Sequence, residues 1–405
     1  MRRARAWGRG LVVALVGTLI ADQLVQHTVL DDGELLGHWV APFDPPLFTD
    51  GQHRRRLEVE ALLAGDASLR ANAMHDATLG WCPAPWQEVG GYLHGANGER
   101  ISSGDARAPT EPKRPLAIAI GGSFTQGAEV TAREAWPALA AKELGFGCAN
   151  LGVAGYGVGQ ALLRFERDGL PLEPDEVWLG FLPEGVLRIT TQFPPILHHW
   201  SSIVAFKPRF TLDSAGRLLL HENPAPTMAD RARLLRDQEA LLGALGGKDL
   251  WLTRTPSAFA PRGTHWTHHF ATTRLALSLW ESGDRDPATH LREEDSAVRR
   301  TLVALFERLR ARCEAAGIQL RVFVLPSRRD LEGLASGEPP YWRGFTEELG
   351  ERGFFVLDTT AALVEAQAPH DPSSWMPNAH YSPHANRTVA DALVAALATE
   401  GGRQN

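Results

Sequence analysis

Cysteine is scarce in this sequence, and neither sign of charge is in marked excess. The 405 residues include three cysteines, Cys82, Cys148 and Cys313, with no CxxC spacing among them. An odd and scattered set of this kind indicates neither a disulfide framework nor a cysteine zinc site, so we expect packing residues. Lys and Arg number 41 against 48 for Asp and Glu, a formal net charge of -7. Nucleic acid is therefore not an expected partner, because binding to phosphates needs concentrated basic residues.

Long apolar runs are also few, and the clearest one lies at the amino terminus. Four arginines among the first nine residues precede an apolar run over Leu11 to Ala21. This order is the one that export machinery reads. We expect residues 1–30 to be an uncleaved signal anchor or transmembrane segment at a bacterial inner membrane, with the rest of the chain facing the periplasm or the outside.

Two other interpretations of the amino terminus stay open. A cleaved signal peptide would need small residues before its cleavage site, and Leu19 interrupts that pattern in the candidate ending at Ala21. A spanning helix needs about 20 mostly apolar residues, and the run is interrupted by Asp22 and Gln23. A soluble protein with an apolar terminal helix is the third interpretation.

Beyond this segment, the sequence divides into an irregular lead-in at 31–115 and an α/β domain at 116–398. Short apolar runs that alternate with helical stretches are typical of a buried parallel sheet with helices on both faces. We therefore predict a three-layer α/β/α, flavodoxin-like fold with a sheet of about five strands. The candidate strands are Leu116 to Ile120, about Gly147 to Leu151, Glu176 to Phe181, Leu320 to Leu325, and Phe354 to Leu357.

An insertion at about 188–292 separates the third and fourth strands, because this stretch is too long for one crossover helix. Alternation of apolar and polar residues around a Ser-Ala-Gly turn predicts a hairpin over Lys207 to Glu222. Charged, Leu- and Ala-bearing sequence predicts a long helix over Glu293 to Ala316. A final helix is expected at about Ala385 to Leu397.

Histidines gather in the insertion, as His198 and His199 and again as His265, His268 and His269. No carboxylate stands at ligand spacing beside them, and loop histidines more often contact solvent or a partner than a metal. The sequence predicts no metal site and no cofactor.

The sharpest local signal is the stretch from Ile120 to Gly127, which reads Ile-Gly-Gly-Ser-Phe-Thr-Gln-Gly. It stands where a predicted strand ends and a helix begins, the edge at which α/β sheets present functional groups. A serine flanked by glycines there has an exposed hydroxyl and is a candidate nucleophile. Ser123 would otherwise be a helix-capping serine, a position that favours this residue in any case.

Four further stretches, in the same order along the chain, resemble the conserved blocks of the SGNH/GDSL hydrolase family. The first block of that family reads Gly-Asp-Ser, often followed by Phe-Thr-x-Gly. The stretches are Asn150 to Gly157 with Gln160, Pro174 to Leu179, Ala379 to Pro383 with Asn386, and an upstream pair of segments, Leu79-Gly80-Trp81 and Asn97 to Arg100, similar to exported bacterial members.

The resemblance implies an acyl-transfer site. It assigns Ser123 as the nucleophile, His380 as the general base, and the backbone N–H groups of Ser123 and Gly155 as donors in the oxyanion hole. A serine needs a neighbouring imidazole to remove its proton, and preorganised donors stabilise the charge that grows on the carbonyl oxygen.

The sequence departs from the family pattern at three positions. Gly122 precedes the serine in place of Asp, and the segment from Gly180 to Gly185 offers no Asn for the oxyanion hole. Asn378 stands where an Asp would orient the histidine. Glu184 and Asp371 are candidate substitutes for that missing carboxylate.

Two hypotheses of different class follow. The first is a serine ester hydrolase or acyltransferase that acts on acyl esters of extracellular glycans or lipids. The second is a catalytically inactive domain of the same fold that binds a glycan or a partner protein at the cell envelope, which the altered Asn and Asp positions would permit.

Overall fold

The structure is a computed structural model of the chain, and it describes residues 15–25, 27, 34–35, 38–39, 60–61, 63–66, 70–102, 114, 116–197, 203–251, 270–273, 275–276, 286–334, 337, 339–366, 368 and 370–401. The chain forms two compact units. The unit that contains the large sheet, called the sheet unit below, comprises Ala73–Thr190, Lys207–Asn223 and Pro287–Asn405. The second unit comprises Met1–Asn72, Thr191–Phe206 and Pro224–Asp286.

Five parallel strands form the sheet, in the spatial order β14-β13-β10-β8-β9. Renumbered along the chain, this is the flavodoxin-like order 2-1-3-4-5, whose switch point lies between β8 and β10. Each strand lies within one residue of its predicted position. The strands are β8 (Leu116–Gly121), β9 (Gly147–Asn150), β10 (Glu176–Phe181), β13 (Gln319–Val324) and β14 (Phe355–Asp358).

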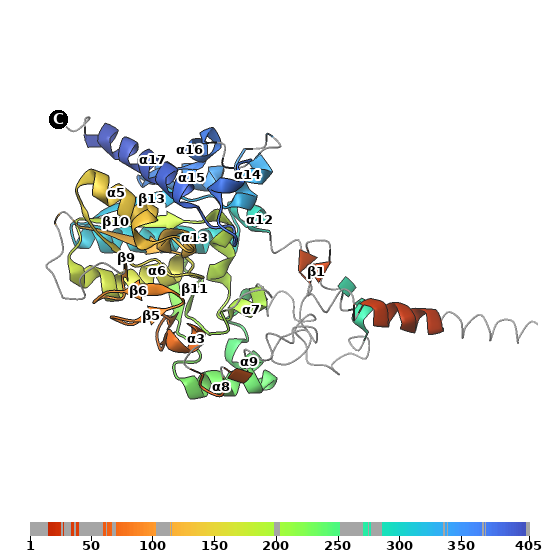
Figure 1. Cartoon of the computed structure of the whole chain (residues 1–405). Coiled ribbons are helices and arrows are strands. Elements are labelled where there is room, and N and C mark those ends of the chain that lie inside the picture. Colours follow the sequence, from red (N-terminus) through yellow and green to blue (C-terminus); the bar gives the residue numbers. More distant parts are fainter. Residues whose placement is uncertain are drawn as a thin grey trace, which may run out of the picture. The chain divides into compact units, whose positions relative to one another are not determined.

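Helices cover both faces of the sheet, so the predicted three-layer fold is confirmed (Figure 1). On one face, α5 (Trp136–Leu144) packs against α17 (Pro383–Gly401). On the other face, α6 (Val158–Arg164) packs against α13 (Ala297–Ala315).

The alternation of side chains along β10 explains why both faces are covered. Trp178 points into the cluster beneath α5 and stacks on Trp136, with 6.3 Å between ring centroids. Phe181, three residues on, points the other way and meets Phe306 of α13 at 5.7 Å. All six residues of β10 are buried, as expected of a central parallel strand.

Two further predicted elements are present in the sheet unit. The predicted hairpin is confirmed as β11 (Arg209–Leu212) and β12 (Leu218–His221). The predicted long helix is α13, which begins later than predicted because Ser296 caps it. The other helices and turns are α4 (Ser123–Gln126), η2 (Ala132–Glu134), η3 (Phe165–Gly169), η4 (Leu170–Leu172), η5 (Pro183–Thr190), α12 (Pro287–Arg292), α14 (Arg328–Leu334), α15 (Arg343–Glu351), α16 (Thr360–Glu365) and η8 (Pro372–Ser374).

The predicted lead-in is more regular than its sequence indicates, because residues 75–101 form short antiparallel strands within the sheet unit. Trp81 and Tyr156 tie these strands to the loop after β9. Trp81 Nε1 donates to the carbonyl of Ala154 at 3.0 Å, and the Tyr156 hydroxyl donates to the carbonyl of Trp81 at 2.5 Å. The strands are β3 (His75–Asp76), β4 (Gly80–Trp81), β5 (Glu88–Val89), β6 (Tyr92–His94) and β7 (Arg100–Ile101).

The second unit is built from short elements and contains buried carboxylates. Asp249 is fully buried and accepts hydrogen bonds from the Thr191 hydroxyl at 2.7 Å and from the Gln192 N–H at 2.9 Å. Its elements are β1 (Glu34–Leu35), β2 (His38–Trp39), α7 (Pro194–Leu197), α8 (Met228–Arg236) and α9 (Gln238–Leu245). The helix α3 (Arg70–Ala73) lies at the boundary between the two units.

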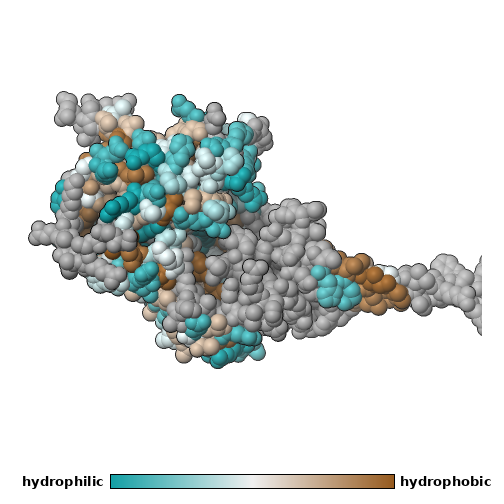
Figure 2. All heavy atoms as spheres, in the orientation of Figure 1, coloured by the Kyte–Doolittle hydropathy of each residue, from teal (hydrophilic) through white to brown (hydrophobic). Residues whose placement is uncertain are grey.

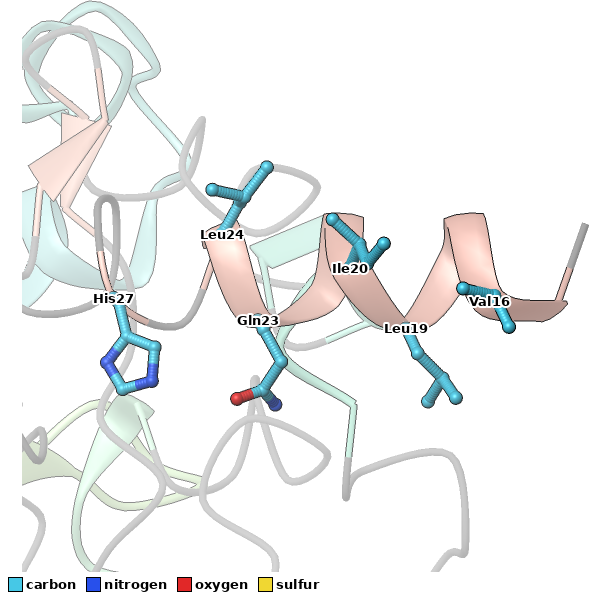
Figure 3. A pocket seen from close by; sticks show the side chains of 6 residues that line it. All are labelled: Val16, Leu19, Ile20, Gln23, Leu24 and His27. Atoms are coloured by element: carbon cyan, nitrogen blue, oxygen red, sulfur yellow. The ribbon is translucent and has the colours of Figure 1, made fainter. Parts of the chain in front are cut away.

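Residues 15–24 of the predicted anchor form a helix, and the segment before them lies outside the described residues. Leu15, Val16, Leu19, Ile20 and Leu24 are exposed, and Figures 2 and 3 show apolar side chains along this helix. Asp22, which interrupts the apolar run, is buried and accepts hydrogen bonds from the N–H and hydroxyl of Thr272 at 2.8 Å. None of the described helices is both long enough and apolar enough to cross a membrane.

Candidate active site

Ser123 begins α4 directly after β8, at the carboxyl edge of the sheet and beside its switch point. The chain turns sharply here through Gly121, whose φ is +148°. A Cβ on Gly121 would lie 2.3 Å from Thr125 Oγ1 and 2.7 Å from the Gly180 carbonyl oxygen, so only glycine fits. The Ser123 side chain forms no hydrogen bond with any described residue, which leaves its hydroxyl available for reaction.

Three hydrogen bonds hold the end of β9 and the loop after it against α4 and the end of β8. Asn150 Nδ2 donates to the Thr125 carbonyl at 2.8 Å, and the Gln126 side chain accepts from the Ala154 N–H at 3.2 Å. The Val153 N–H donates to the Gly121 carbonyl at 3.1 Å. These contacts hold the loop that carries Gly155, with a φ of +82°, against α4. Within the described part of the chain, the N–H groups of Ser123 and Gly155 have no acceptor, as an oxyanion hole requires.

His380 contacts a carboxylate that the sequence analysis does not single out. Its Nδ1 lies 2.7 Å from Oε2 of Glu129, a residue 251 positions earlier in the chain. The other oxygen, Oε1, accepts hydrogen bonds from the backbone N–H of Asn378 at 3.2 Å and from its side-chain amide at 2.8 Å. Glu129 therefore orients the imidazole, and Asn378 orients Glu129.

This hydrogen bond determines which nitrogen of His380 can act as a base. Burial alone would raise the pKa of the Glu129 carboxyl, but the hydrogen bonds from His380 and Asn378 outweigh it and lower the pKa below its ordinary value. An ionised carboxylate only accepts hydrogen bonds, so the neutral imidazole carries its proton on Nδ1. Nε2 is then the nitrogen with a free lone pair, and no described residue donates to it.

The backbone is strained on both sides of the contact between Glu129 and His380. Glu129 has a φ of 68° and Ala379, which precedes the histidine, has a φ of 61°. Residues other than glycine adopt this left-handed region at a cost of about 1–2 kcal/mol, and such residues persist where surrounding contacts hold them. Those contacts are present on the Glu129 side, because Glu129 donates its N–H to the Tyr92 hydroxyl at 2.9 Å.

Arg100 of β7 holds the turn that carries Glu129. Its buried guanidinium donates to the carbonyl oxygens of Gln126, Gly127 and Val130 and stacks over the Tyr92 ring at 4.2 Å. Strand β7 of the lead-in thus holds the turn of the carboxylate from outside the five-stranded sheet.

The histidine segment is held just as firmly. The Met376 N–H donates to the His380 carbonyl at 2.8 Å, and the Tyr381 hydroxyl donates to the Pro326 carbonyl at 2.6 Å. Asn386, at the start of α17, donates to the Tyr381 carbonyl at 3.0 Å and accepts from the Trp136 N–H at 3.0 Å. These contacts fix the loop before α17 against α5.

Phe124, the residue after Ser123, packs against the segment that carries His380. The Phe124 ring lies 5.4 Å from the imidazole and 4.7 Å from the Tyr381 ring, centroid to centroid. Ser123 and His380 form no hydrogen bond with each other in the described structure. Catalytic hydrogen bonds are often loose before substrate binds, so the pairing of these two residues stays a prediction.

Neither Glu184 nor Asp371, the carboxylates predicted as substitutes, forms a hydrogen bond with His380 in the described structure. Asp371 caps η8, accepting from the N–H of Ser373 at 2.9 Å and from its hydroxyl at 2.6 Å. Glu184 lies in η5, where its electrostatic neighbours are Arg188 and Asp330. Glu129 lies six residues after Ser123, and no pattern in the sequence singles it out.

A small cavity adjoins the serine turn. Its volume is about 20 Å³, and residues from the loops after β8, β9 and β10 line it, with Arg188 among them. The described residues contain no cluster of side chains able to hold a metal ion. The histidines His198, His199, His265, His268 and His269 lie outside the described residues.

No protein-family model matches the chain, and no curated protein matches it. One similar solved structure is a protein described as lipolytic and of the G-D-S-L family from Desulfitobacterium hafniense, with 12% identity, a TM-score of 0.37 and coverage of 70% of this chain and 99% of that one. A second is a catalytic mutant of an acetylxylan esterase from Geobacillus stearothermophilus, with 12% identity, a TM-score of 0.37 and coverage of 70% and 94%. A third is an esterase from Pseudoalteromonas sp., with 10% identity, a TM-score of 0.33 and coverage of 71% and 99%.

Proposed function

We propose that the protein is a serine ester hydrolase or acyltransferase with Ser123 as nucleophile, His380 as general base and Glu129 as the carboxylate that orients the base. The observation that carries the proposal is the 2.7 Å contact between His380 Nδ1 and Glu129 Oε2. Glu129 supplies a negative charge behind the imidazole. The lack of such a charge at Asn378 was the reason to consider an inactive domain. A carboxylate there fixes the tautomer and stabilises the imidazolium that forms during reaction.

The chemistry proceeds in two half-reactions. The Ser123 oxygen attacks the carbonyl carbon of the ester while His380 Nε2 accepts the hydroxyl proton. The carbonyl oxygen becomes an oxyanion beside the N–H groups of Ser123 and Gly155. The bond to the leaving alcohol breaks as His380 returns the proton to that alcohol. Water or a second alcohol then attacks the acyl-serine by the same steps in reverse.

The proposed substrates are acyl esters of extracellular glycans or lipids, and the proposed location is a bacterial inner membrane with the sheet unit facing the periplasm or the outside. The arginine-rich start and the apolar run after it support the location. The exposed Leu15, Leu19 and Ile20 of helix 15–24 agree with it.

Cell fractionation tests the location. In a bacterial host, the full-length protein should pellet with membranes, and protease added to spheroplasts should digest its domain. Recovery of the full-length chain in the cytosol would contradict export. A soluble periplasmic form that lacks the first residues would contradict only the anchor.

Hydrolysis of p-nitrophenyl acetate by the wild type and by Ser123→Ala and His380→Ala tests the activity. Removal of a triad member lowers kcat by about 10,000-fold or more in serine hydrolases, so we expect both variants to lose activity by about this factor. Equal hydrolysis by all three proteins would leave the binding hypothesis as the better account.

A further inference from the structure

Arg188 reaches from the loop after β10 toward the turn that carries the serine. It lies in η5, and its Nη1 donates to the Tyr156 carbonyl at 3.2 Å. A Cβ on Gly122 would lie 3.1 Å from this same Nη1 and 3.1 Å from the Tyr156 carbonyl oxygen. The guanidinium therefore lies directly against Gly122, and a side chain at position 122 would require a small shift of Arg188 or of the Tyr156 carbonyl.

These two neighbours place the guanidinium close to both backbone donors of the oxyanion hole. Gly122 precedes Ser123, and Tyr156 follows Gly155. The cavity of about 20 Å³ adjoins this place, and it is lined by Gly122, Tyr156 and Arg188 but not by Ser123 or Gly155. A volume of this size holds about one water-sized group, such as a single oxygen of a reacting carbonyl.

The charge of Arg188 is poorly solvated and weakly compensated. Burial lowers the pKa of Arg188, and the neighbouring Glu184 only partly opposes this effect. The guanidinium nevertheless stays protonated, as arginine does throughout proteins. No described carboxylate lies within ion-pair distance of it. A charge in such surroundings interacts more strongly with a developing anion than it would in water.

We propose that Arg188 is a catalytic residue that donates to the oxyanion formed when Ser123 attacks an ester carbonyl, together with the N–H groups of Ser123 and Gly155. This inference rests on the proposed esterase function. The oxygen gains its negative charge as the serine oxygen bonds to the carbonyl carbon, and it loses that charge when the bond to the leaving alcohol breaks. Arg188 stays protonated throughout, so no proton or electron is transferred to or from it.

Arg188→Met tests the proposal, because methionine keeps an unbranched side chain without charge or donors. Loss of one oxyanion donor costs about 100- to 1000-fold in turnover. We expect kcat for p-nitrophenyl acetate to fall by this factor while KM stays within about threefold, because the contact strengthens only in the transition state. Arg188→Lys keeps the charge and should recover part of kcat.

A matched control is Arg209→Met. Arg209 lines a neighbouring cavity together with Arg188 but does not line the cavity beside Gly122. If only the general positive charge of this region matters, both methionine variants should lose the same activity. The proposal instead requires that Arg209→Met keep most of kcat.

Inhibition by phenylboronic acid separates a catalytic from a structural contribution. Boronic acids form a tetrahedral adduct with an active serine and present an oxygen to the oxyanion hole. Inhibition should weaken in Arg188→Met by about the factor lost in kcat. If Arg188→Met does not fold, as judged by circular dichroism, Arg188→Leu, which also lacks charge and donors, answers the same question with the same inhibitor.

The outcomes distinguish failure of this inference from failure of the proposed function. A wild type that neither hydrolyses the ester nor binds the boronate refutes the function itself. An active wild type whose folded Arg188→Met and Arg188→Lys variants both retain kcat and boronate affinity within about threefold overturns the inference alone.

Discussion

At the scale of single residues, Glu129→Gln is the most informative change in the site. A glutamine can donate to Nδ1 and so favours the tautomer with the proton on Nε2, which cannot act as a base; an analogous change in serine proteases costs about 10,000-fold in kcat. We expect a loss of about 1000-fold or more in ester turnover with the fold intact. Glu143→Gln is a suitable control, because Glu143 pairs with Arg387 of α17 at 2.7 Å, on the surface. Turnover of Glu129→Gln within tenfold of the wild type would remove Glu129 from the mechanism.

Asn378→Asp tests which residue orients His380. The family resemblance expects an aspartate at position 378, whereas in the structure Glu129 contacts the histidine. The Asn378 amide donates to Glu129 at 2.8 Å, and an aspartate there would replace this hydrogen bond with the repulsion of two carboxylates. We expect Asn378→Asp to lower kcat severalfold at neutral pH and to raise the pH at which activity appears. A gain in turnover, measured across pH 5 to 9, would show that Asn378 and not Glu129 occupies the position of the orienting acid.

The sequence was sufficient to single out Ser123 and His380 but not Glu129. Glycines around a serine at a strand end are a local pattern, and a histidine before the last helix belongs to a recognisable block. Glu129 contacts His380 only because two residues with positive φ and a buried arginine bring distant segments together. None of these conditions leaves a periodic or spaced signature in the sequence.

At the scale of elements, β7 acts on the site through Arg100. Arg100→Met should leave the carbonyl oxygens of Gln126, Gly127 and Val130 without their donor, at a cost of about 3 kcal/mol in the free energy of unfolding. Because the same turn carries Glu129, we expect kcat to fall while KM stays nearly unchanged. Urea unfolding and ester kinetics measure the two effects.

Arg114→Met is the control for Arg100→Met. Arg114 also donates to backbone carbonyl oxygens, those of Leu172 and Glu173, but these lie at the edge of the sheet away from Glu129. We therefore expect Arg114→Met to change kcat little. If Arg100→Met lost stability but kept its kcat, β7 would be a structural support with no effect on Glu129.

The five strands were predictable because a parallel strand buried on both faces reads as a short apolar run. The strands over 75–101 were not, because each contains only two or three residues and is defined by tertiary hydrogen bonds such as that of Trp81. The departure at Gly122 also has a local reason, since Arg188 and the Tyr156 carbonyl approach this residue so closely that a side chain there would require one of them to shift.

At the scale of the whole molecule, Asp330 makes stability depend on pH. Burial raises its pKa to about 6 although it accepts hydrogen bonds from the Ser327 N–H at 2.8 Å and the Tyr341 hydroxyl at 2.8 Å. The folded state therefore binds a proton that the unfolded state releases near pH 4. The stability contributed by this proton is complete below pH 4 and is lost as the pH rises through about 6.

Asp330→Asn removes this titration. The free energy of unfolding of the variant, minus that of the wild type, should increase by about 3 kcal/mol between pH 4 and pH 7, because one pKa unit corresponds to about 1.4 kcal/mol. Urea unfolding at several pH values measures this difference. A difference that stays constant over the range would show that Asp330 does not hold a proton in the fold.

The central claim is that Ser123 is an activated nucleophile, and covalent labelling with a fluorophosphonate probe tests it most directly. An unactivated serine does not react with such a probe, whereas a serine with an oriented imidazole and an oxyanion hole does. Mass spectrometry of the labelled wild type should place the adduct on Ser123, Ser123→Ala should carry no label, and Glu129→Gln should label far more slowly. A wild type that stays unlabelled, or a label that persists in Ser123→Ala, would contradict the account.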